Sequence, residues 1–471
     1  MPTLPTDETH LQAGRQVAQR HALRHGRLRQ KSKLRQKAQR ASLPSLQHVQ
    51  KGKAHRRIPR SAPDPRRPQQ GDRGRVLSKI KNEIIKKNQT FTFDLNKKLG
   101  DNTRVNLPYP KLIKKIRKGN IVLIDDGKFA FKVTRANRKS IITKCLSQNF
   151  TINDKKSVHI KDISLPFNNL TNKDKSDIKI AKKIGCNWIA LSYLQNAKLV
   201  HQARKLINKD VGIIAKIENK LALKNINEII KASDAIMIAR GDLALEIGHS
   251  EVPKIQLGLI KKCNESSKSV IVATQMLESM IDNYTATRAE INDIATAIFQ
   301  GADTVMLSAE TAVGRYPYQS VKTMVKTIIS TEKYKKEHIE DFKNSIDVKK
   351  DPVKSIVLSV KDLAYNPSVK AIIAFSNSGN TAKLVSAVRP RVKIITISPN
   401  INISRQMSLL WGVHSINSRD ASGWKDMMNI SREIIKKDKN IKKNDFVVIT
   451  AGLPFGNAGM TNMIRLYKVG S

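Results

Sequence analysis

Five short apolar stretches, each ending in charged, hydroxyl or glycine residues, constrain the fold of this chain most strongly. They are NWIALSY near Ser192, IIAKIEN with Lys216 and Glu218, MIARGDLALEI around Asp242, VATQMLESM around Thr274, and DTVMLSAET ending at Glu310. Such stretches are typical of buried parallel strands that present polar residues at their carboxyl ends. Their spacing leaves room for one helix between each pair, so the sequence predicts the alternating strands and helices of a TIM-type barrel.

The composition predicts a protein of about three domains in a reducing compartment. A chain of 471 residues with 40% hydrophobic residues is long enough for several packed cores. No apolar run approaches the roughly 20 residues of a membrane helix, so we expect no membrane partner. Cys145, Cys186 and Cys263 are widely separated and lack metal-type spacing. This cysteine usage argues against a disulfide framework and favours a cytoplasmic location.

The formal net charge of +47 would ordinarily suggest nucleic-acid binding. After about residue 76, however, the excess is mostly lysine scattered along presumed helix faces, as in KSDIKIAKKIG. The sequence shows no interleaving of aromatic with basic residues and no recognisable nucleic-acid module. We therefore expect no nucleic-acid partner, and a basic surface that attracts phosphorylated anions in general.

The pattern divides the chain into four segments. Residues 1–75 lack Phe, Tyr, Trp, Asn and Cys and have no sustained apolar face. Residues 76–156 contain short alternating runs such as TFTFD, FAFKV and SIITKC, which predict a small all-β domain. Residues 157–340 hold the five strands and their helices, and residues 352–471 again alternate helix and strand, which predicts an open α/β sheet. One helix is expected in LTNKDKSDIKIAKKIG, capped by Thr171 and stopped by Gly185.

The residues at the predicted strand ends are suited to a metal site beside an anion site. Glu218 and Asp242, on successive strands, are hard oxygen ligands that suit Mg²⁺ or Mn²⁺. Lys216 lies two residues before Glu218, on the same face of its strand, and can meet the same reacting group. A lysine and a metal that converge on one anion are typical of phosphoryl transfer or enolate stabilisation. Charged strand ends are also often simple solvated caps, and the interpretation depends on several of them meeting at one rim.

Small and hydroxylated residues extend this predicted site. Gly241 precedes Asp242 and allows backbone N–H groups to approach an anion closely. Thr274 and Ser308 add hydroxyl groups at the same rim, able to orient a proton or a water molecule.

The motifs AKIEN, ARGDL, ATQMLESM, TRAE and MLSAET, in this order and spacing, resemble the pyruvate kinase family. The resemblance runs from about Lys79 to the C-terminus and includes VLIDDG, LTNKDK, WIALSY and TAGLPFGNAGMTN. It implies a (β/α)8 barrel, an inserted β-rich lid domain over residues 76–156 and a C-terminal open α/β domain. It also implies transfer of the phosphoryl group of phosphoenolpyruvate to ADP, which gives ATP and pyruvate in the last step of glycolysis.

The resemblance assigns roles residue by residue. Lys216 would stabilise the transferring phosphoryl group and the enolate oxygen, and Glu218 and Asp242 would bind Mg²⁺. The backbone at Gly241 and Asp242, together with Thr274, would hold the substrate carboxylate, and Thr274 would also lie on the proton route. The remaining assignments are Lys173 near the nucleotide, Arg240, Ser308 and Glu310 behind the site, and a possible effector loop with Ser376, Ser378, Gly379 and Thr381. A plain turn is an equally good interpretation of that loop.

The resemblance does not extend to the first 75 residues. Family members have three barrel strands before the lid, with RLNFSHG-type and DLKGPK-type motifs that supply substrate contacts and the K⁺ ligands, and neither motif occurs here. A disordered basic tail, a transit peptide and a reading-frame error are the three interpretations of these residues, and the matching length favours the frame error.

The prediction is therefore a barrel that has lost its first three strands, with doubtful activity and no K⁺ ligands. The alternatives are a catalytically dead scaffold or binding protein and, among enzymes, an aldolase or lyase barrel. The family is usually homotetrameric.

Overall fold

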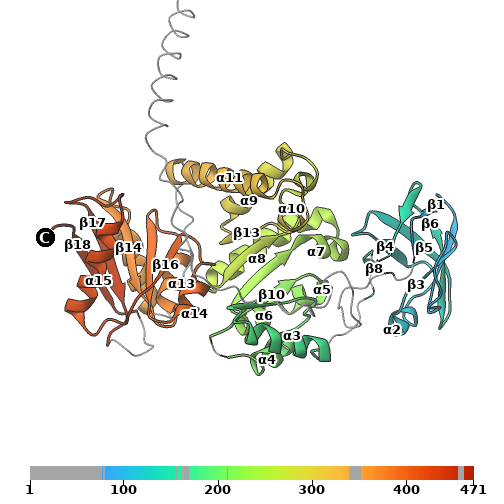
Figure 1. The fold of residues 1–471 in the computed structure, drawn as a ribbon, viewed down its shortest axis with the longest axis horizontal. Coiled ribbons are helices and arrows are strands. Elements are labelled where there is room, and N and C mark those ends of the chain that lie inside the picture. The colour runs from blue at the N-terminus through green and yellow to red at the C-terminus, as the bar shows by residue number, and fades with distance from the viewer. Residues whose placement is uncertain are drawn as a thin grey trace, which may run out of the picture. The chain divides into compact units, whose positions relative to one another are not determined.

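A computed structural model of the chain describes residues 77, 80–154, 156–161, 163, 169–208, 210–338, 352–454 and 461–471. The segment predicted to be out of frame or disordered, residues 1–75, lies outside them, as do residues 455–460 of the TAGLPFGNAGMTN motif. The strands of the described part form a two-stranded, a six-stranded and two five-stranded sheets. Figure 1 labels many of the strands and helices, which are numbered in chain order.

The first region is rich in short strands, as its alternating sequence predicts. Its elements are β1 (Glu83–Ile85), β2 (Thr90–Asp94), β3 (Arg104–Asn106), α2 (Pro110–Ile113), β4 (Ile121–Ile124), β5 (Phe129–Ala136), β6 (Ser140–Cys145), β7 (Phe150–Ile152) and β8 (Val158–Ile160). Strands β1 and β7 pair with each other, and the larger sheet has the order β3-β2-β6-β5-β4-β8. Its core contains Phe91, Phe93 and Phe131, with the ring of Phe93 edge-on to the other two at 5.2 and 5.4 Å between centroids. Strand β8 lies beyond residue 156, so this sheet extends past the end predicted for the lid.

The second region contains the five predicted strands as one parallel sheet of order β13-β12-β11-β10-β9. The strands are β9 (Trp188–Leu191), β10 (Gly212–Ile217), β11 (Ala235–Ala239), β12 (Ser269–Ala273) and β13 (Thr304–Met306). The helices are α3 (Asn172–Lys183), α4 (Ala197–Arg204), α5 (Lys220–Lys224), α6 (Ile226–Ala232), α7 (Arg240–Ile247), α8 (Val252–Glu265), α9 (Arg288–Gln300), α10 (Ala309–Ala312) and α11 (Pro317–His338), with short 3₁₀ turns at His249–Glu251 and Glu278–Ile281. Within the described residues, β9 and β13 each pair with one neighbour only.

Local sequence signals set the helix ends of this region. Thr171 caps α3 by accepting a hydrogen bond from the Asp174 N–H, while the Asp174 carboxylate accepts from the Thr171 N–H, a capping box. Gly185, just past this helix, has φ +77°, as the sequence predicts for a residue that ends a helix. Helix α9 begins with the same device, formed by Thr287 and Glu290.

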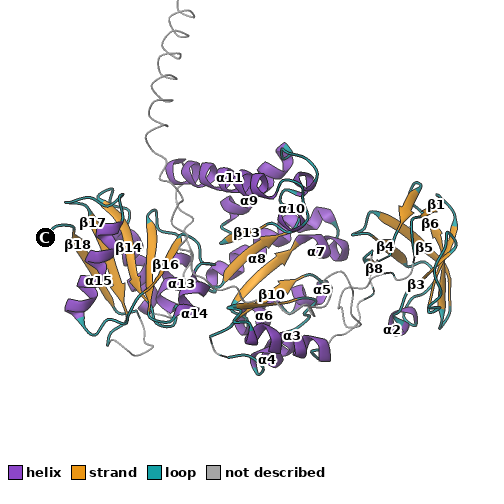
Figure 2. Cartoon of the chain, in the orientation of Figure 1, coloured by secondary structure: helices purple, strands orange, loops and turns teal. Residues whose placement is uncertain are grey.

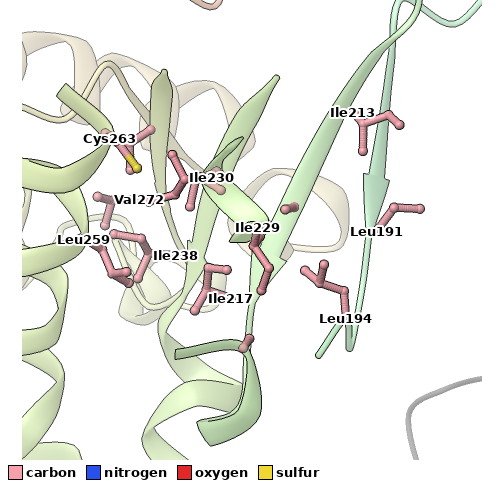
Figure 3. Packing of buried hydrophobic residues seen from close by; sticks show 14 of the residues in the cluster. Leu191, Leu194, Ile213, Ile217, Ile229, Ile230, Ile238, Leu259, Cys263 and Val272 are labelled. Atoms are coloured by element: carbon pink, nitrogen blue, oxygen red, sulfur yellow. The ribbon is translucent and has the colours of Figure 1, made fainter. Parts of the chain in front are cut away.

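The helices cover one face of the parallel sheet with a continuous apolar core. Figure 3 shows Ile238 and Val272, from neighbouring strands, beside Leu259 and Cys263 of α8. All four side chains are at most 3% exposed. Alternate residues of the same strands point to the other face and form a much smaller cluster that includes Ile214, Met237 and Ile271.

The third region is an α/β sheet of order β16-β15-β14-β17-β18, parallel except for β18, which is antiparallel to β17. Its elements are α12 (Pro352–Leu363), β14 (Val369–Phe375), α13 (Asn380–Ala387), β15 (Lys393–Ser398), α14 (Ile401–Met407), β16 (Val413–Asn417), α15 (Trp424–Lys437), β17 (Phe446–Ala451) and β18 (Met463–Lys468). Figure 2 shows helices beside the strands of this sheet and of the parallel sheet in the second region. The alternation of helix and strand along residues 352–471 agrees with the open α/β sheet that the sequence predicts.

None of the helices in the described part of the chain is long and apolar enough to cross a bilayer.

Removal of a buried side chain from the helix-covered face should destabilise the protein strongly. Ile238 is fully buried on the central strand β11, so Ile238→Ala should lower the free energy of unfolding by about 2–5 kcal/mol. Ile184 is 71% exposed, and Ile184→Ala should change it by less than about 0.5 kcal/mol. Urea unfolding followed by circular dichroism measures both values. Equal losses in the two variants would contradict the assigned core.

Candidate functional site

The in-register pairing of the parallel strands brings the predicted site residues to one edge of the sheet. Ala215 pairs with Leu191, Ile217 with Ile238, and Ala239 with Ala273. The residues that follow these positions therefore emerge at one rim. They are Ser192 and Tyr193 after β9, Glu218 after β10, Arg240, Gly241 and Asp242 after β11, Thr274 after β12, and Ser308 shortly after β13.

Lys216 and Glu218 form a close ion pair, as expected for two residues on the same face of one strand. Lys216 Nζ lies 2.5 Å from Glu218 Oε1 and donates a hydrogen bond of 2.8 Å to Ser192 Oγ. The Glu218 side chain is 1% exposed and that of Lys216 is 24% exposed. The ammonium group is thus held at the tip of β10 between two partners and keeps access to solvent.

Tyr193 connects the two predicted metal ligands. Its backbone N–H donates to Glu218 Oε2 at 2.5 Å, and its hydroxyl donates to Asp242 Oδ1 at 3.2 Å. Its φ of +53° places it in the left-handed region, two residues after β9 ends. Tyr193 is absent from the set of site residues predicted from the sequence. Its position directly after a predicted strand end, in WIALSY, is the signal that points to it.

Burial raises the pKa of both carboxyl groups above the ordinary range. For Glu218, burial is the largest cause, opposed by the charge of Lys216 and its hydrogen bond, while the Asp242 carboxylate raises the pKa further. Burial likewise raises the pKa of Asp242, and Lys216 and the Tyr193 hydroxyl oppose this effect. Both carboxylates therefore lie in surroundings that disfavour their charges, and the charge of Asp242 reaches Glu218.

Thr274 and Gly241 meet across the rim. The Gly241 N–H donates to Thr274 Oγ1 at 2.9 Å, and this hydroxyl donates to the carbonyl oxygen of Ala273 at 2.6 Å. Gly241 and Asp242 occupy the first turn of α7, where backbone N–H groups are free of helical partners and favour an anion. The three residues predicted to hold the substrate carboxylate, Gly241, Asp242 and Thr274, thus meet at the N-terminus of α7.

The side chains of Arg240 and Glu310 are buried behind this rim. Arg240 is 6% exposed and donates to the carbonyl oxygen of Thr274. Glu310 is 3% exposed and accepts hydrogen bonds from the backbone N–H groups of Ser308 and Leu277. These side chains hold backbone segments of neighbouring strand ends in place.

The other predicted site residues lie elsewhere. Lys173 is in the first turn of α3, where it pairs with Asp177 at 2.5 Å. The possible effector loop follows β14: Gly379 has φ +81°, Ser378 is exposed, and Thr381 is buried with its hydroxyl 2.8 Å from that of Thr461.

The residues at the rim fit a hard divalent cation. Glu218 Oε1 has no hydrogen-bond partner among the described residues besides its ion pair, and the charge of the nearby Asp242 carboxylate raises the pKa of Glu218. In the described part of the chain, no three His, Cys, Asp or Glu side chains form a metal cluster. Mg²⁺ is usually bound by one or two carboxylates together with substrate oxygens, and it keeps several water ligands. The two carboxylates at this rim fit that pattern.

Replacement of Glu218 by glutamine should change the pH dependence of stability. The pKa of Glu218 in the folded protein is raised above the usual 4.5. Ionisation of Glu218 therefore destabilises the fold as pH rises from the usual pKa through the raised one. Relative to the wild type, Glu218→Gln should therefore gain stability as pH rises from about 4 toward neutrality. Thermal unfolding across this pH range measures the difference. At neutral pH, Mg²⁺ should raise the unfolding temperature of the wild type more than that of the variant.

Glu290 provides a control of opposite sign. Burial raises its pKa, but hydrogen bonds from Ser279 and Thr287 outweigh this effect, so its pKa is lowered. Its charge therefore contributes stability above the usual pKa that is lost as pH falls. Glu290→Gln should lose stability relative to the wild type as pH rises. The same slope in both variants would contradict the assignment of Glu218.

Comparisons with known proteins agree with this architecture. Residues 69–321 match the family model "Pyruvate kinase, barrel domain", and residues 354–467 match "Pyruvate kinase, alpha/beta domain". Pyruvate kinases of Sporosarcina psychrophila and Agrobacterium vitis are 37% and 34% identical over 381 and 388 residues. These matches cover 79% and 82% of this chain.

The chain spans 64% of the Sporosarcina protein, less than two thirds of its length, and 80% of the Agrobacterium protein. A crystal structure of a pyruvate kinase from Cryptosporidium parvum has a TM-score of 0.73 and 29% sequence identity. That match covers 84% of this chain and 82% of the other. The two family models, the relatives and the shared α/β fold together show that this chain belongs to the pyruvate kinase family.

Proposed function

We propose that this chain transfers the phosphoryl group of phosphoenolpyruvate to ADP, which gives pyruvate and ATP. The observation that carries the proposal is the position of Lys216 Nζ, held between Ser192 Oγ and Glu218 Oε1 at the rim where Asp242, Gly241 and Thr274 also lie. A fixed cation beside two carboxylates and a helix N-terminus is suited to an anionic substrate that carries both a phosphate and a carboxylate. Membership of the pyruvate kinase family supports the same reaction.

In this reaction the bond between the enol oxygen and phosphorus breaks, and a terminal oxygen of ADP gains the phosphoryl group. Lys216 would stabilise the charge on the phosphoryl group and on the enolate oxygen left behind. Because Lys216 is already oriented by Ser192 and Glu218, little reorganisation is needed during the transfer.

The rim at the start of α7 would hold the substrate carboxylate. The N–H groups of Gly241 and Asp242 and the hydroxyl of Thr274 are the proposed donors. In the structure, the Gly241 N–H is occupied by Thr274 Oγ1, so a bound carboxylate would replace this internal hydrogen bond. The Thr274 hydroxyl would also lie on the route by which a proton reaches the enolate.

Glu218 and Asp242 would hold Mg²⁺ (or Mn²⁺). The bound ion would neutralise charge on the substrate oxygens. In its absence Lys216 and Tyr193 offset part of the carboxylate charge.

The proposal also covers the nucleotide, a possible effector, the oligomeric state and K⁺. Lys173 would contact the nucleotide, and the loop containing Ser376, Ser378, Gly379 and Thr381 would bind a phosphorylated effector. As in the family, we propose a cytoplasmic homotetramer. K⁺ is a further cofactor of the family, but its usual ligand motifs are not found in the sequence.

Lys216→Met should abolish most of the activity. Loss of the ammonium group should lower kcat by at least about 10²-fold, because one charge-stabilising donor is removed from the reacting centre. Phosphoenolpyruvate-dependent ATP formation in the presence of Mg²⁺ measures the effect. The control is Lys268→Met: Lys268 lies just before β12, at the opposite end of the sheet, and donates to the carbonyl oxygen of Ser233 at 2.6 Å.

Lys268→Met should retain the kcat of the wild type per folded molecule. The proposal is wrong if the folded wild type forms no ATP, or if Lys216→Met is as active as the wild type. Binding of phosphoenolpyruvate without turnover would instead support a non-catalytic scaffold.

A further inference from the structure

The turn that carries Thr274 has a strained backbone. Thr274 and Gln275 have φ values of +69° and +55°. The left-handed region is unfavourable for residues other than glycine, and a β-branched residue such as threonine is a clear outlier there. Such conformations persist only where the surrounding structure holds them, and they are concentrated at functional sites. The contacts of this turn therefore identify what maintains its shape.

Arg240 makes most of those contacts. Its Nη2 donates to the carbonyl oxygens of Thr274 at 2.6 Å and of Gln275 at 3.2 Å, and its Nε donates to the Thr274 oxygen at 3.2 Å. One planar guanidinium group thus binds both strained peptide units. A lysine could not reproduce this pattern, because its ammonium group lacks the fixed fork of donors.

Arg240 is itself fixed on its other side. Its Nη1 lies 2.6–2.7 Å from the two carboxylate oxygens of Asp293 on α9. The arginine side chain is 7% exposed, whereas that of Asp293 is 34% exposed. The guanidinium group therefore connects α9 to the Thr274 turn.

Glu310 secures the far end of the same turn. It accepts a hydrogen bond of 3.1 Å from the Leu277 N–H and one of 2.7 Å from the Ser308 N–H. Two buried side chains of opposite charge thus hold the carbonyl and amide groups of residues 274–277. Of these two, only Arg240 contacts the peptide units with positive φ.

We propose that Arg240 is a positioning residue that holds the Thr274–Gln275 turn in its left-handed conformation. It thereby aims the Thr274 hydroxyl at the Gly241 N–H, where the substrate carboxylate would bind. The consequence for catalysis rests on the function proposed above, whereas the effect on the turn does not. Arg240 touches no reacting atom in this scheme and acts through Thr274.

The test compares Arg240→Ala, Arg240→Lys and Asp293→Asn with a matched control, Arg204→Met. Arg204 also donates to one backbone carbonyl, that of Val211, and pairs with one carboxylate, that of Asp234. It lies at the opposite end of the same sheet and is more exposed. Amide hydrogen exchange of peptides covering residues 274–277 reports on the turn, and steady-state kinetics report on the site.

The three site variants should exchange faster at residues 274–277, with the largest increase in Arg240→Ala, while the control exchanges there as the wild type does. In Arg240→Ala, kcat should fall by about 10²-fold and the KM for phosphoenolpyruvate should rise, with the KM for ADP unchanged. Arg240→Lys should be only partly impaired. If Arg240→Ala does not fold, Arg240→Lys and Asp293→Asn still decide the question.

Unchanged exchange at residues 274–277 in the folded site variants would overturn the proposal. The proposal would also be overturned if kcat fell and the KM values for phosphoenolpyruvate and for ADP rose equally, because a general structural defect produces that pattern. A wild-type protein without phosphoenolpyruvate-dependent ATP formation would refute the proposed reaction. In that case the exchange data alone would decide the role of Arg240.

Discussion

The parallel register of β9 to β13 is the constraint on which the site depends. Ala239 pairs with Ala273, and the residues that follow, Arg240 and Thr274, meet at the rim because their strands end level with each other. A slip of one residue would turn each strand's side chains to the other face. The apolar face against the helices prevents such a slip, since Ile238 and Val272 would leave the core. Packing on the helix-covered face therefore fixes which side chains lie at the rim of the sheet.

The rim of the parallel sheet holds two buried carboxylates, whose negative charges burial disfavours. Burial raises the pKa values of Glu218 and Asp242, and a neighbouring carboxylate raises each further: Asp242 acts on Glu218, and Asp126 acts on Asp242. Lys216 and Tyr193 offset part of this effect through an ion pair and hydrogen bonds. Such an arrangement is unfavourable for the fold by itself and favourable for binding a cation, a combination that is typical of functional sites.

The sequence predicts the strands of the parallel sheet well, because each is a buried apolar run that ends in polar residues. It also predicts that Lys216 and Glu218 share a face, since that follows from the two-residue repeat of a strand. It does not predict the left-handed backbone of Tyr193 and Thr274, or the hydrogen bonds that Arg240 donates to the Thr274 turn. These depend on contacts between strands distant in sequence, which leave no local pattern. In the C-terminal region, β16 (VHSIN) has only two apolar residues, Val413 and Ile416, so its sequence carries a weak strand signal.

The direct junction between β11 and α7 has a consequence for how sequences of this type can vary. Strand β11 ends at Ala239 and the helix begins at Arg240, with no linker between them. Each residue of an α-helix turns the chain by about 100°, so a single insertion or deletion at this junction would rotate Asp242 away from the rim by that angle. Variation in length is therefore excluded at this point, although loops elsewhere on the fold can absorb it. In related sequences, alignment gaps should be absent between Ala239 and Asp242.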